Sequence, residues 1–267
     1  MDLELTGKRA LVTGGSRGIG KAVARALAQE GADVALLARD AADLAATAAE
    51  LMAATGRTVV GVVADTRDEA AVQAAVAEAA ARLGGPLQIL VNAAAEPAGY
   101  AGPPKLGEIT GAFFQAELDT KVMGYIRCSQ AVLPGMRATG WGRIVHVSGL
   151  AARQAGNTVG SIRNVAVAAL AKNMADELGP AGIQVTVVHP GITRTERTAP
   201  LLAARAAAQG VDPATLEAQM AAGNSIQHLV DATEVAHVVA FLCSPKSRAI
   251  NGDAVCVGGG APRAIHY

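Results

Sequence analysis

The part of this chain best suited to chemistry is a glycine-rich stretch, Thr13-Gly14-Gly15-Ser16-Arg17-Gly18-Ile19-Gly20. An apolar run over residues 9–12 precedes it, and Ile19, Val23 and Leu27 then recur at helical spacing. Glycines let backbone N–H groups approach an anion closely, and the positive end of a helix dipole stabilises negative charge there. The pattern predicts a strand, a phosphate-binding turn and a helix, and hence dinucleotide binding by Gly14, Ser16, Arg17, Gly18, Ile19 and Gly20.

The next predicted strand, residues 33–38, is followed by Arg39. A protein that prefers NAD usually has an acidic residue here, bound to the ribose 2′-hydroxyl. Arg39 and Arg17 instead offer two planar guanidinium groups, which bind phosphate bidentately. We therefore predict NADP(H) as cofactor in preference to NAD(H). The alternative is that both are ordinary surface arginines.

Short apolar runs alternate with alanine-rich helical segments along the whole chain. The predicted strands are 9–12, 33–38, 58–64, 87–91, 142–147, 184–188 and 254–257, and the helices after the first are about 40–55, 68–83, 110–138, 160–178 and 233–242. This alternation predicts an α/β fold, a single-domain Rossmann-type doubly wound parallel sheet with helices on both faces. No linker divides residues 1–267, and residues 192–230 are expected to form an irregular, partly helical substrate lid.

The composition narrows the range of partners. With 23 basic and 23 acidic residues in 267, the net charge is zero, so neither nucleic acid nor a membrane surface is an expected partner. No apolar run approaches the roughly 18 residues of a membrane span, the N-terminus is not a secretory signal, and the three cysteines lack metal-ligand spacing. We expect a cytoplasmic protein that binds a small-molecule substrate and no metal.

Several of these motifs together resemble the short-chain dehydrogenase/reductase family, over about residues 5–260. The glycine-rich stretch matches its TGxxxGxG pattern, Asn92-Ala93-Ala94-Ala95 is a degenerate form of its NNAG segment that keeps the first asparagine, and Pro190-Gly191 matches its PG turn. The resemblance implies a Rossmann-type fold, a nicotinamide cofactor, and a homodimer or homotetramer packed through the helices at 110–138 and 160–178. It also implies that further residues contact the cofactor: Asp65, Thr66, Asn92, Ala93, Ala94, Pro190, Gly191, Thr193 and Thr195.

The chain departs from this family where the catalytic tyrosine and lysine of the YxxxK motif are expected. By alignment Gly160 replaces the tyrosine and Asn164 the lysine, and no tyrosine occurs between Tyr125 and Tyr267. In the family the tyrosine donates a proton to the substrate oxygen, with its pKa lowered by the lysine. The usual proton donor is therefore missing.

Lys121 stands where the family asparagine is expected on the long helix, so the resemblance implies that lysine and asparagine have exchanged positions 121 and 164. A partly desolvated lysine can act as an acid or base near neutral pH. We therefore take Lys121, Asn164 and Ser148, which lies where the family serine lies, as candidate catalytic residues. In the alternative interpretation Lys121 is solvated or bonded to a carbonyl, and Ser148 is structural.

Other side chains are secondary candidates. His146 shares a strand face with Ser148, although a buried structural histidine is more common, and Arg163 either binds a substrate anion or lies at the surface. Glu96 and Tyr100 follow the fourth strand, within reach of substrate, and Tyr100 is a candidate substitute phenol. Tyr125 shares the helix face of Lys121 and is expected to pack against the neighbouring helix.

Two functions remain open at this point. The first is an NADP(H)-dependent oxidoreductase that acts on a small carbonyl, alcohol or activated double bond with an atypical proton donor. The alternative is a nucleotide-binding family member without hydride transfer, with a non-redox lyase- or hydrolase-type reaction or a sensing role. The cofactor motifs favour the first function, and the missing tyrosine favours the second.

Overall fold

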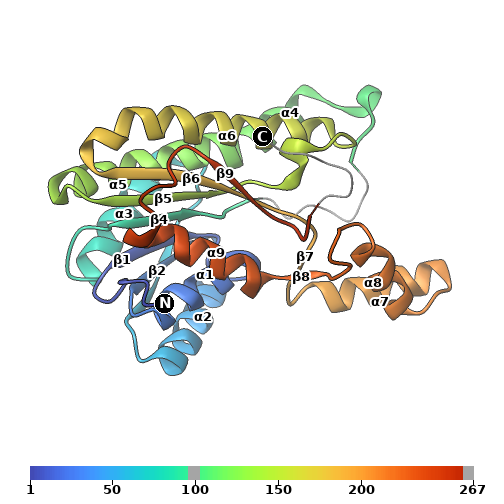
Figure 1. Cartoon of the computed structure of the whole chain (residues 1–267), viewed down its shortest axis with the longest axis horizontal. Coiled ribbons are helices and arrows are strands. Elements are labelled where there is room, and N and C mark those ends of the chain that lie inside the picture. The colour runs from blue at the N-terminus through green and yellow to red at the C-terminus, as the bar shows by residue number, and fades with distance from the viewer. Residues whose placement is uncertain (96–102, 261–267) are drawn as a thin grey trace.

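Seven parallel strands form the central sheet of the computed structural model, which describes residues 1–95 and 103–260 (Figure 1). Their order across the sheet is β3-β2-β1-β4-β5-β6-β9. The strands are β1 (Arg9–Thr13), β2 (Asp33–Ala38), β3 (Val59–Val63), β4 (Ile89–Asn92), β5 (Gly142–Val147), β6 (Ile183–Pro190) and β9 (Ala254–Val257). This is the doubly wound parallel sheet that the alternation predicts, and the Rossmann-type fold is confirmed.

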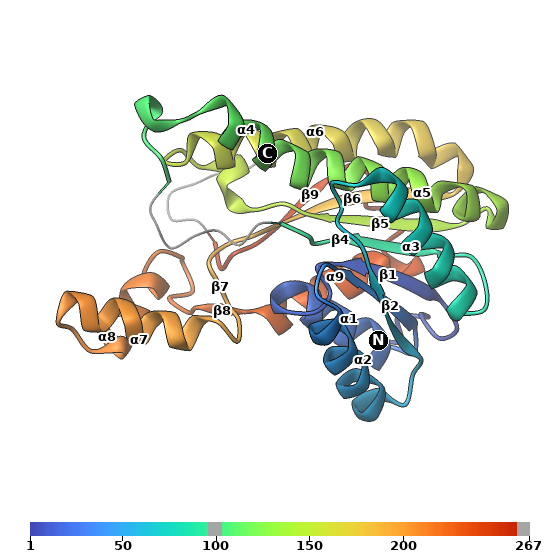
Figure 2. The same ribbon diagram turned by 180° about the vertical axis from the view of Figure 1, so that it is seen from behind.

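Helices cover both faces of the sheet because alternate strand residues point to opposite sides. In β1, Val12 packs with one layer and Leu11 with the other. The first layer contains α1 (Gly18–Gln29), α2 (Ala41–Thr55) and α9 (Ala232–Cys243), and the second contains α3 (Glu69–Arg82), α5 (Gly124–Thr139) and α6 (Thr158–Leu178) (Figure 2). A continuous core of buried, mainly aliphatic side chains lies between each helix layer and the sheet.

The carboxyl ends of β1 and β4 meet at the point where the chain reverses its direction of travel across the sheet. After β3 the chain returns to the other side of β1, and Thr13 lies in register with Asn92. In open α/β sheets a ligand binds in the crevice beyond such a pair of strand ends. The predicted phosphate loop and the segment after β4 therefore lie side by side.

The long helix predicted at 110–138 is interrupted. It consists of α4 (Gly111–Leu118), a five-residue π-helical turn (Asp119–Met123) and α5. A π turn inserts one extra residue into a helix and is frequent at functional sites. Lys121 lies in the middle of this turn, so the irregularity coincides with the lysine that is predicted to replace the family asparagine.

The segment predicted as an irregular lid at 192–230 is more regular than expected. It contains β7 (Thr193–Arg194), α7 (Thr198–Gln209), α8 (Pro213–Ala221) and β8 (Val230–Asp231), with β7 and β8 paired in parallel. In Figure 1 α7 and α8 project beyond the carboxyl ends of the main strands. No helix in the described ranges is both long and apolar enough to cross a lipid bilayer.

Candidate active site and cofactor site

The glycine-rich loop between β1 and α1 is too tightly folded to accept side chains at two of its glycines. A Cβ atom at Gly20 would lie 2.2 Å from the carbonyl oxygen of Gly14. Gly14 itself has a φ of +67°, and a Cβ there would come within 3.0 Å of Ala94 Cα. Thr47 Oγ1 donates a hydrogen bond of 3.0 Å to the Ser16 carbonyl and holds the loop from α2. The result is a cradle lined by backbone atoms.

The N-terminus of α1 faces this cradle without a cap of its own. Arg17 is the N-cap residue, its side chain makes no capping bond, and the first turn contains no acidic residue. The Gly18 N–H instead donates a hydrogen bond of 2.8 Å to Glu196 Oε1, from the turn between β7 and α7. A carboxylate therefore occupies the helix N-terminus, as expected of a site that attracts anions.

The two arginines of the predicted NADP(H) site follow the ends of β1 and β2. Arg17 and Arg39 are both exposed. The Asp65 carboxylate, just after β3, is held by the Arg67 guanidinium and backbone N–H, and these bonds with the charge of Arg39 lower its pKa. Arg39 and Asp65 are thus near neighbours. Thr66 is buried, and its carbonyl accepts a hydrogen bond from Arg127.

At the end of β4, Thr13 Oγ1 accepts hydrogen bonds of 3.0 and 3.1 Å from the N–H groups of Ala93 and Ala94, which fixes that segment against the loop. The Asn92 side chain is fully buried, and its Nδ2 lies 3.1 Å from His146 Nδ1. Burial lowers the His146 pKa to about 3, so its ring is neutral at physiological pH. His146 is therefore the buried structural histidine of the alternative interpretation.

Lys121 is a buried lysine at the carboxyl end of β5. Its side chain enters from the π turn, is only 5% exposed, and Nζ donates a hydrogen bond of 2.8 Å to the Ser148 carbonyl. Desolvation, helped by the charge of Arg163 and opposed by that of Glu117, lowers the Lys121 pKa to about 7. The alternative prediction that Lys121 is solvated is therefore wrong. The other alternative, a hydrogen bond from Lys121 to a neighbouring carbonyl, is present as the bond to Ser148.

Ser148 and Asn164 lie next to this amine. The Ser148 hydroxyl donates a hydrogen bond of 3.1 Å to the Asn164 carbonyl. Asn164 is buried, its Oδ1 has no hydrogen-bond partner in the described part of the chain, and its Nδ2 lies 2.9 Å from where a Gly149 Cβ would be. Any side chain at position 149 would crowd the amide, so Gly149 and Asn164 fit one another. The three candidate catalytic residues are thus brought together.

Gly160 occupies the first turn of α6. Its N–H donates a 2.8 Å hydrogen bond to Asn157 Oδ1, which caps the helix, and a Cβ at Gly160 would lie 2.6 Å from Asn157 Nδ2. The start of α6 is therefore built around a glycine at position 160, which is predicted to align with the family tyrosine.

Two of the secondary candidates differ from expectation. Arg163 is not a surface arginine: it forms an ion pair with Glu117 of α4, and both side chains are less than one-fifth exposed, at 15% and 17%. Tyr125 is buried as expected, but against β5 rather than a helix, because its ring stacks on His146 and its hydroxyl donates to the Val147 carbonyl at 2.8 Å. Its phenol is therefore committed to a structural bond.

The turn after β6 packs against the end of β9. The Gly191 N–H donates to the Val257 carbonyl, and a Cβ at Gly191 would lie 2.9 Å from Gly258 Cα, so Pro190-Gly191 runs closely past the end of β9. Thr193 Oγ1 donates to the Gly191 carbonyl at 3.1 Å. Pro190, Gly191 and Thr193 therefore follow one another at the carboxyl ends of β6 and β9.

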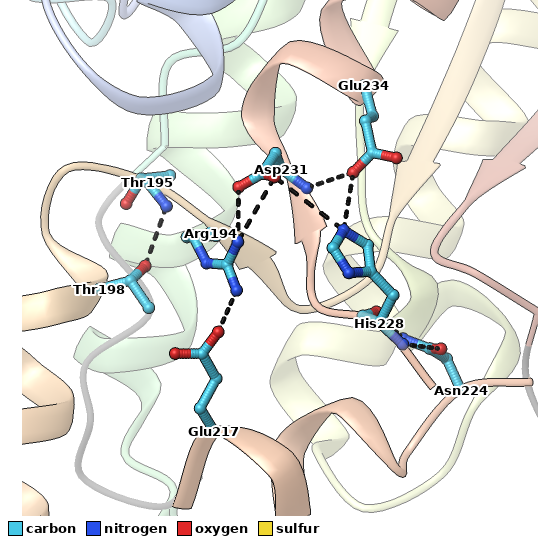
Figure 3. A network of polar contacts seen from close by, with 8 residues as sticks. All are labelled: Arg194, Thr195, Thr198, Glu217, Asn224, His228, Asp231 and Glu234. Carbon is cyan, nitrogen blue, oxygen red and sulfur yellow. Dashed lines mark hydrogen bonds and ion pairs between the residues drawn. The ribbon is translucent and has the colours of Figure 1, made fainter. Parts of the chain in front are cut away.

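An ionic network holds the next segment in place (Figure 3). Arg194 lies between Asp231, at 3.3 Å, and Glu217 of α8, and it connects β7 to β8 and to α8. The Thr195 N–H donates to Thr198 Oγ1 at 2.9 Å. This turn positions Glu196.

Glu96 and Tyr100 lie outside the described residues. Glu196 and Glu117 were missed by the sequence analysis, because each acts through a partner far away in the chain and neither belongs to a local motif.

The sheet order and the tightly folded glycine-rich loop at the β1–β4 switch point define a nucleotide-binding protein of the Rossmann class. Residues 8–206 match the model of the short chain dehydrogenase family. The chain therefore belongs to the short-chain dehydrogenase/reductase family of oxidoreductases.

Its relatives cover nearly the whole chain. It is 35% identical over 254 residues to the short-chain reductase protein NovJ of Streptomyces niveus, covering 95% of this chain and 93% of that protein. The structure of L-sorbose reductase from Gluconobacter frateurii with NADPH and L-sorbose is similar with a TM-score of 0.91 at 28% identity, covering 99% and 100% of the two chains. A short-chain dehydrogenase from Burkholderia cenocepacia, in complex with NADP, is 35% identical with a TM-score of 0.78, covering 96% and 98%.

Proposed function

We propose that this protein is an NADP(H)-dependent oxidoreductase that acts on a small carbonyl compound, alcohol or activated double bond, with Lys121 as proton donor. The observation that carries the proposal is the buried Lys121 amine beside Ser148, with a pKa of about 7. A group with a pKa near the working pH transfers protons most effectively. The reductase relatives support the class of reaction.

The crevice fits a dinucleotide on two observations. Side chains are excluded at Gly14 and Gly20, which leaves room for a pyrophosphate against the backbone, and the Gly18 N–H already binds a carboxylate. Arg17 and Arg39 would hold the 2′-phosphate, and Thr193 with Pro190-Gly191 would hold the nicotinamide end. When bound, the nicotinamide supplies or accepts a hydride. The neighbouring structures that contain NADPH or NADP support the preference for NADP(H).

Lys121 would supply the proton that the missing tyrosine supplies elsewhere. An ammonium group has three N–H donors, so one can keep the bond to the Ser148 carbonyl while another faces the substrate oxygen. In reduction the charged amine donates its proton to that oxygen, and in oxidation the neutral amine accepts one. The Arg163–Glu117 pair lies close enough to affect the Lys121 pKa from both directions.

Ser148 and Asn164 would orient the substrate around this amine. The Ser148 oxygen keeps acceptor capacity while its proton is held by the Asn164 carbonyl. Asn164 Oδ1, buried and without a partner among the described residues, is a ready acceptor for a hydroxyl of the substrate or of the nicotinamide ribose. Ser148 connects both groups to the amine, because its carbonyl accepts from Lys121 Nζ and its hydroxyl donates to the Asn164 carbonyl.

The competing function is nucleotide binding without hydride transfer. It is favoured by the hydrogen bond in which the Ser148 hydroxyl donates its proton to the Asn164 backbone carbonyl.

A turnover assay distinguishes the oxidoreductase from a protein that only binds the nucleotide. The protein is incubated with NADPH and a panel of ketones, aldehydes and enones, and the absorbance of the reduced cofactor is followed. Oxidation of NADPH by one of these classes supports the oxidoreductase, whereas tight NADPH binding with no turnover on any class rejects it.

Replacing Arg39 by alanine is expected to weaken NADPH binding about 10-fold and to change NADH binding less than about two-fold, because a charge-assisted bond to the 2′-phosphate is lost. Fluorescence titration with both cofactors measures the two Kd values. Arg137→Ala, an exposed arginine paired with Glu177, serves as control. An equal loss of affinity for NADPH and NADH would show that Arg39 does not bind the 2′-phosphate.

We also propose that the chain is one domain with a substrate lid at about 192–230, and that it assembles as a homodimer or homotetramer. The position of α7 and α8 beyond the strand ends supports the lid. Exposed apolar side chains on α4 and α6, Phe113, Ile162 and Val165, support packing through these helices, since water would otherwise cover them.

A further inference from the structure

We propose that Glu196 is an internal competitor of the cofactor: its carboxylate holds the N-terminus of α1 in the empty protein and must leave before a pyrophosphate binds there. This inference rests on the proposed cofactor site and adds to it a residue that sets cofactor affinity. It starts from the 2.8 Å hydrogen bond that the Gly18 N–H donates to Glu196 Oε1.

The contact joins two segments that are 178 residues apart in the chain. Gly18 is the first residue of α1, where the N–H groups have no partner within the helix. Neither the N-cap residue nor the first turn supplies a carboxylate or hydroxyl to satisfy them. Glu196 therefore takes the role that a local capping side chain or a bound phosphate would otherwise have.

Glu196 is held in position by its own neighbours. The Thr195 N–H donates to Thr198 Oγ1, and the Thr198 N–H donates to the Thr195 carbonyl at 3.0 Å, which forms a tight turn around Glu196. Immediately before it, Arg194 is anchored to Asp231 and Glu217 (Figure 3). These hydrogen bonds and ion pairs therefore fix the turn that places the Glu196 carboxylate at the N-terminus of α1.

Competition follows from charge and donor number. A carboxylate and a phosphate oxygen both need the N–H groups of this helix end and the positive end of its dipole, and two anions on the same donors repel each other. Binding of the cofactor must therefore displace Glu196 from Gly18. Because Glu196 belongs to the turn between β7 and α7, its displacement releases one contact between the lid segment and α1.

The test compares Glu196→Gln with the wild-type chain and with Glu177→Gln, a matched charge change at an exposed residue of α6. Glutamine keeps the size of the side chain and removes the negative charge. We expect Glu196→Gln to bind NADPH about two- to five-fold more tightly by fluorescence titration, the range given by a charge at a helix N-terminus, and Glu177→Gln to bind as the wild type does. Without cofactor, backbone amides around Gly18 are expected to exchange hydrogen faster in Glu196→Gln alone.

The outcomes are distinguishable. Wild-type protein that binds NADPH, together with Glu196→Gln that binds it equally or more weakly, overturns the competition and leaves the cofactor site intact. If none of the three chains binds NADPH, the proposed cofactor site is rejected, and the competition is rejected with it. A tighter Kd in Glu196→Gln together with faster exchange near Gly18 supports the inference.

Discussion

Replacing Lys121 by methionine is expected to abolish most of the turnover and, at neutral pH, to make the protein more stable. Loss of a positioned general acid lowers kcat by about 100- to 10,000-fold. Methionine fills a similar volume and carries no charge, so the variant escapes the cost of burying an ammonium group. Steady-state kinetics with NADPH and urea unfolding of the same preparations measure the two effects.

The size of the stability gain depends on pH. Below pH 7 Lys121 is charged in both the folded and the unfolded chain, and the folded state bears the full cost of burial. Between about 7 and 10.5 the folded state has released its proton while the unfolded state keeps it, so the cost falls as the pH rises, and above 10.5 it is zero. Lowering the pKa from 10.5 to about 7 corresponds to about 5 kcal/mol, of which about 1.5 kcal/mol is offset by the lost bond to Ser148. We therefore expect Lys121→Met to gain about 3 kcal/mol at pH 6.5 and about zero at pH 9.5.

Kinetics give an independent measure of the same group. For reduction, kcat/KM is expected to fall as the pH rises through about 7, because the amine must be protonated to donate. Lys172→Met, at an exposed lysine paired with Asp176, is the matched control and should change neither turnover nor its pH profile. Unchanged turnover in Lys121→Met would remove this residue from the mechanism, and a stability that does not depend on pH as described would contradict its low pKa.

Replacing Gly20 by alanine is expected to weaken NADPH binding by 100-fold or more. The added Cβ would lie 2.2 Å from the Gly14 carbonyl oxygen, a contact with backbone that a side-chain rotation cannot relieve. The loop must therefore open, and the backbone N–H groups lose their common direction. Titration with NADPH measures the affinity, and thermal unfolding shows a destabilisation of about 2 kcal/mol for a strained buried position.

The control for this variant is Gly111→Ala, in the first turn of α4. A Cβ there meets nothing within 4 Å, so alanine is expected to leave cofactor binding unchanged and to stabilise the helix slightly. Wild-type affinity in Gly20→Ala would mean that the cradle is not where the pyrophosphate binds.

Much of the fold could be read from the sequence because buried parallel strands are continuous apolar runs. The strands at 33–38, 142–147 and 254–257 are where the runs predict them. The end of β6 was placed too early, since His189-Pro190 has no strand signal. Pro190 is nevertheless in register with Val257, at the last position of the strand, where a missing N–H costs little.

The helix at 110–138 shows where local pattern is insufficient. Its apolar spacing continues past Lys121, so nothing in the sequence marks the π turn there. In the same way Arg163 resembles a surface arginine until α4 brings Glu117 to it. Both features depend on how two helices pack against each other, so neither can be predicted from the sequence of one helix alone.

The sequence by itself determined the fold class, the family and the glycine cradle, because each of these depends on residues that are neighbours in the chain. The tertiary structure decided which side chains face one another at the sheet edge. It buried Lys121 against the Ser148 carbonyl, and it brought Glu196 to the start of α1. The pKa of an amine and the occupancy of a helix N-terminus depend on desolvation and charge from distant segments, and only the folded chain brings these together.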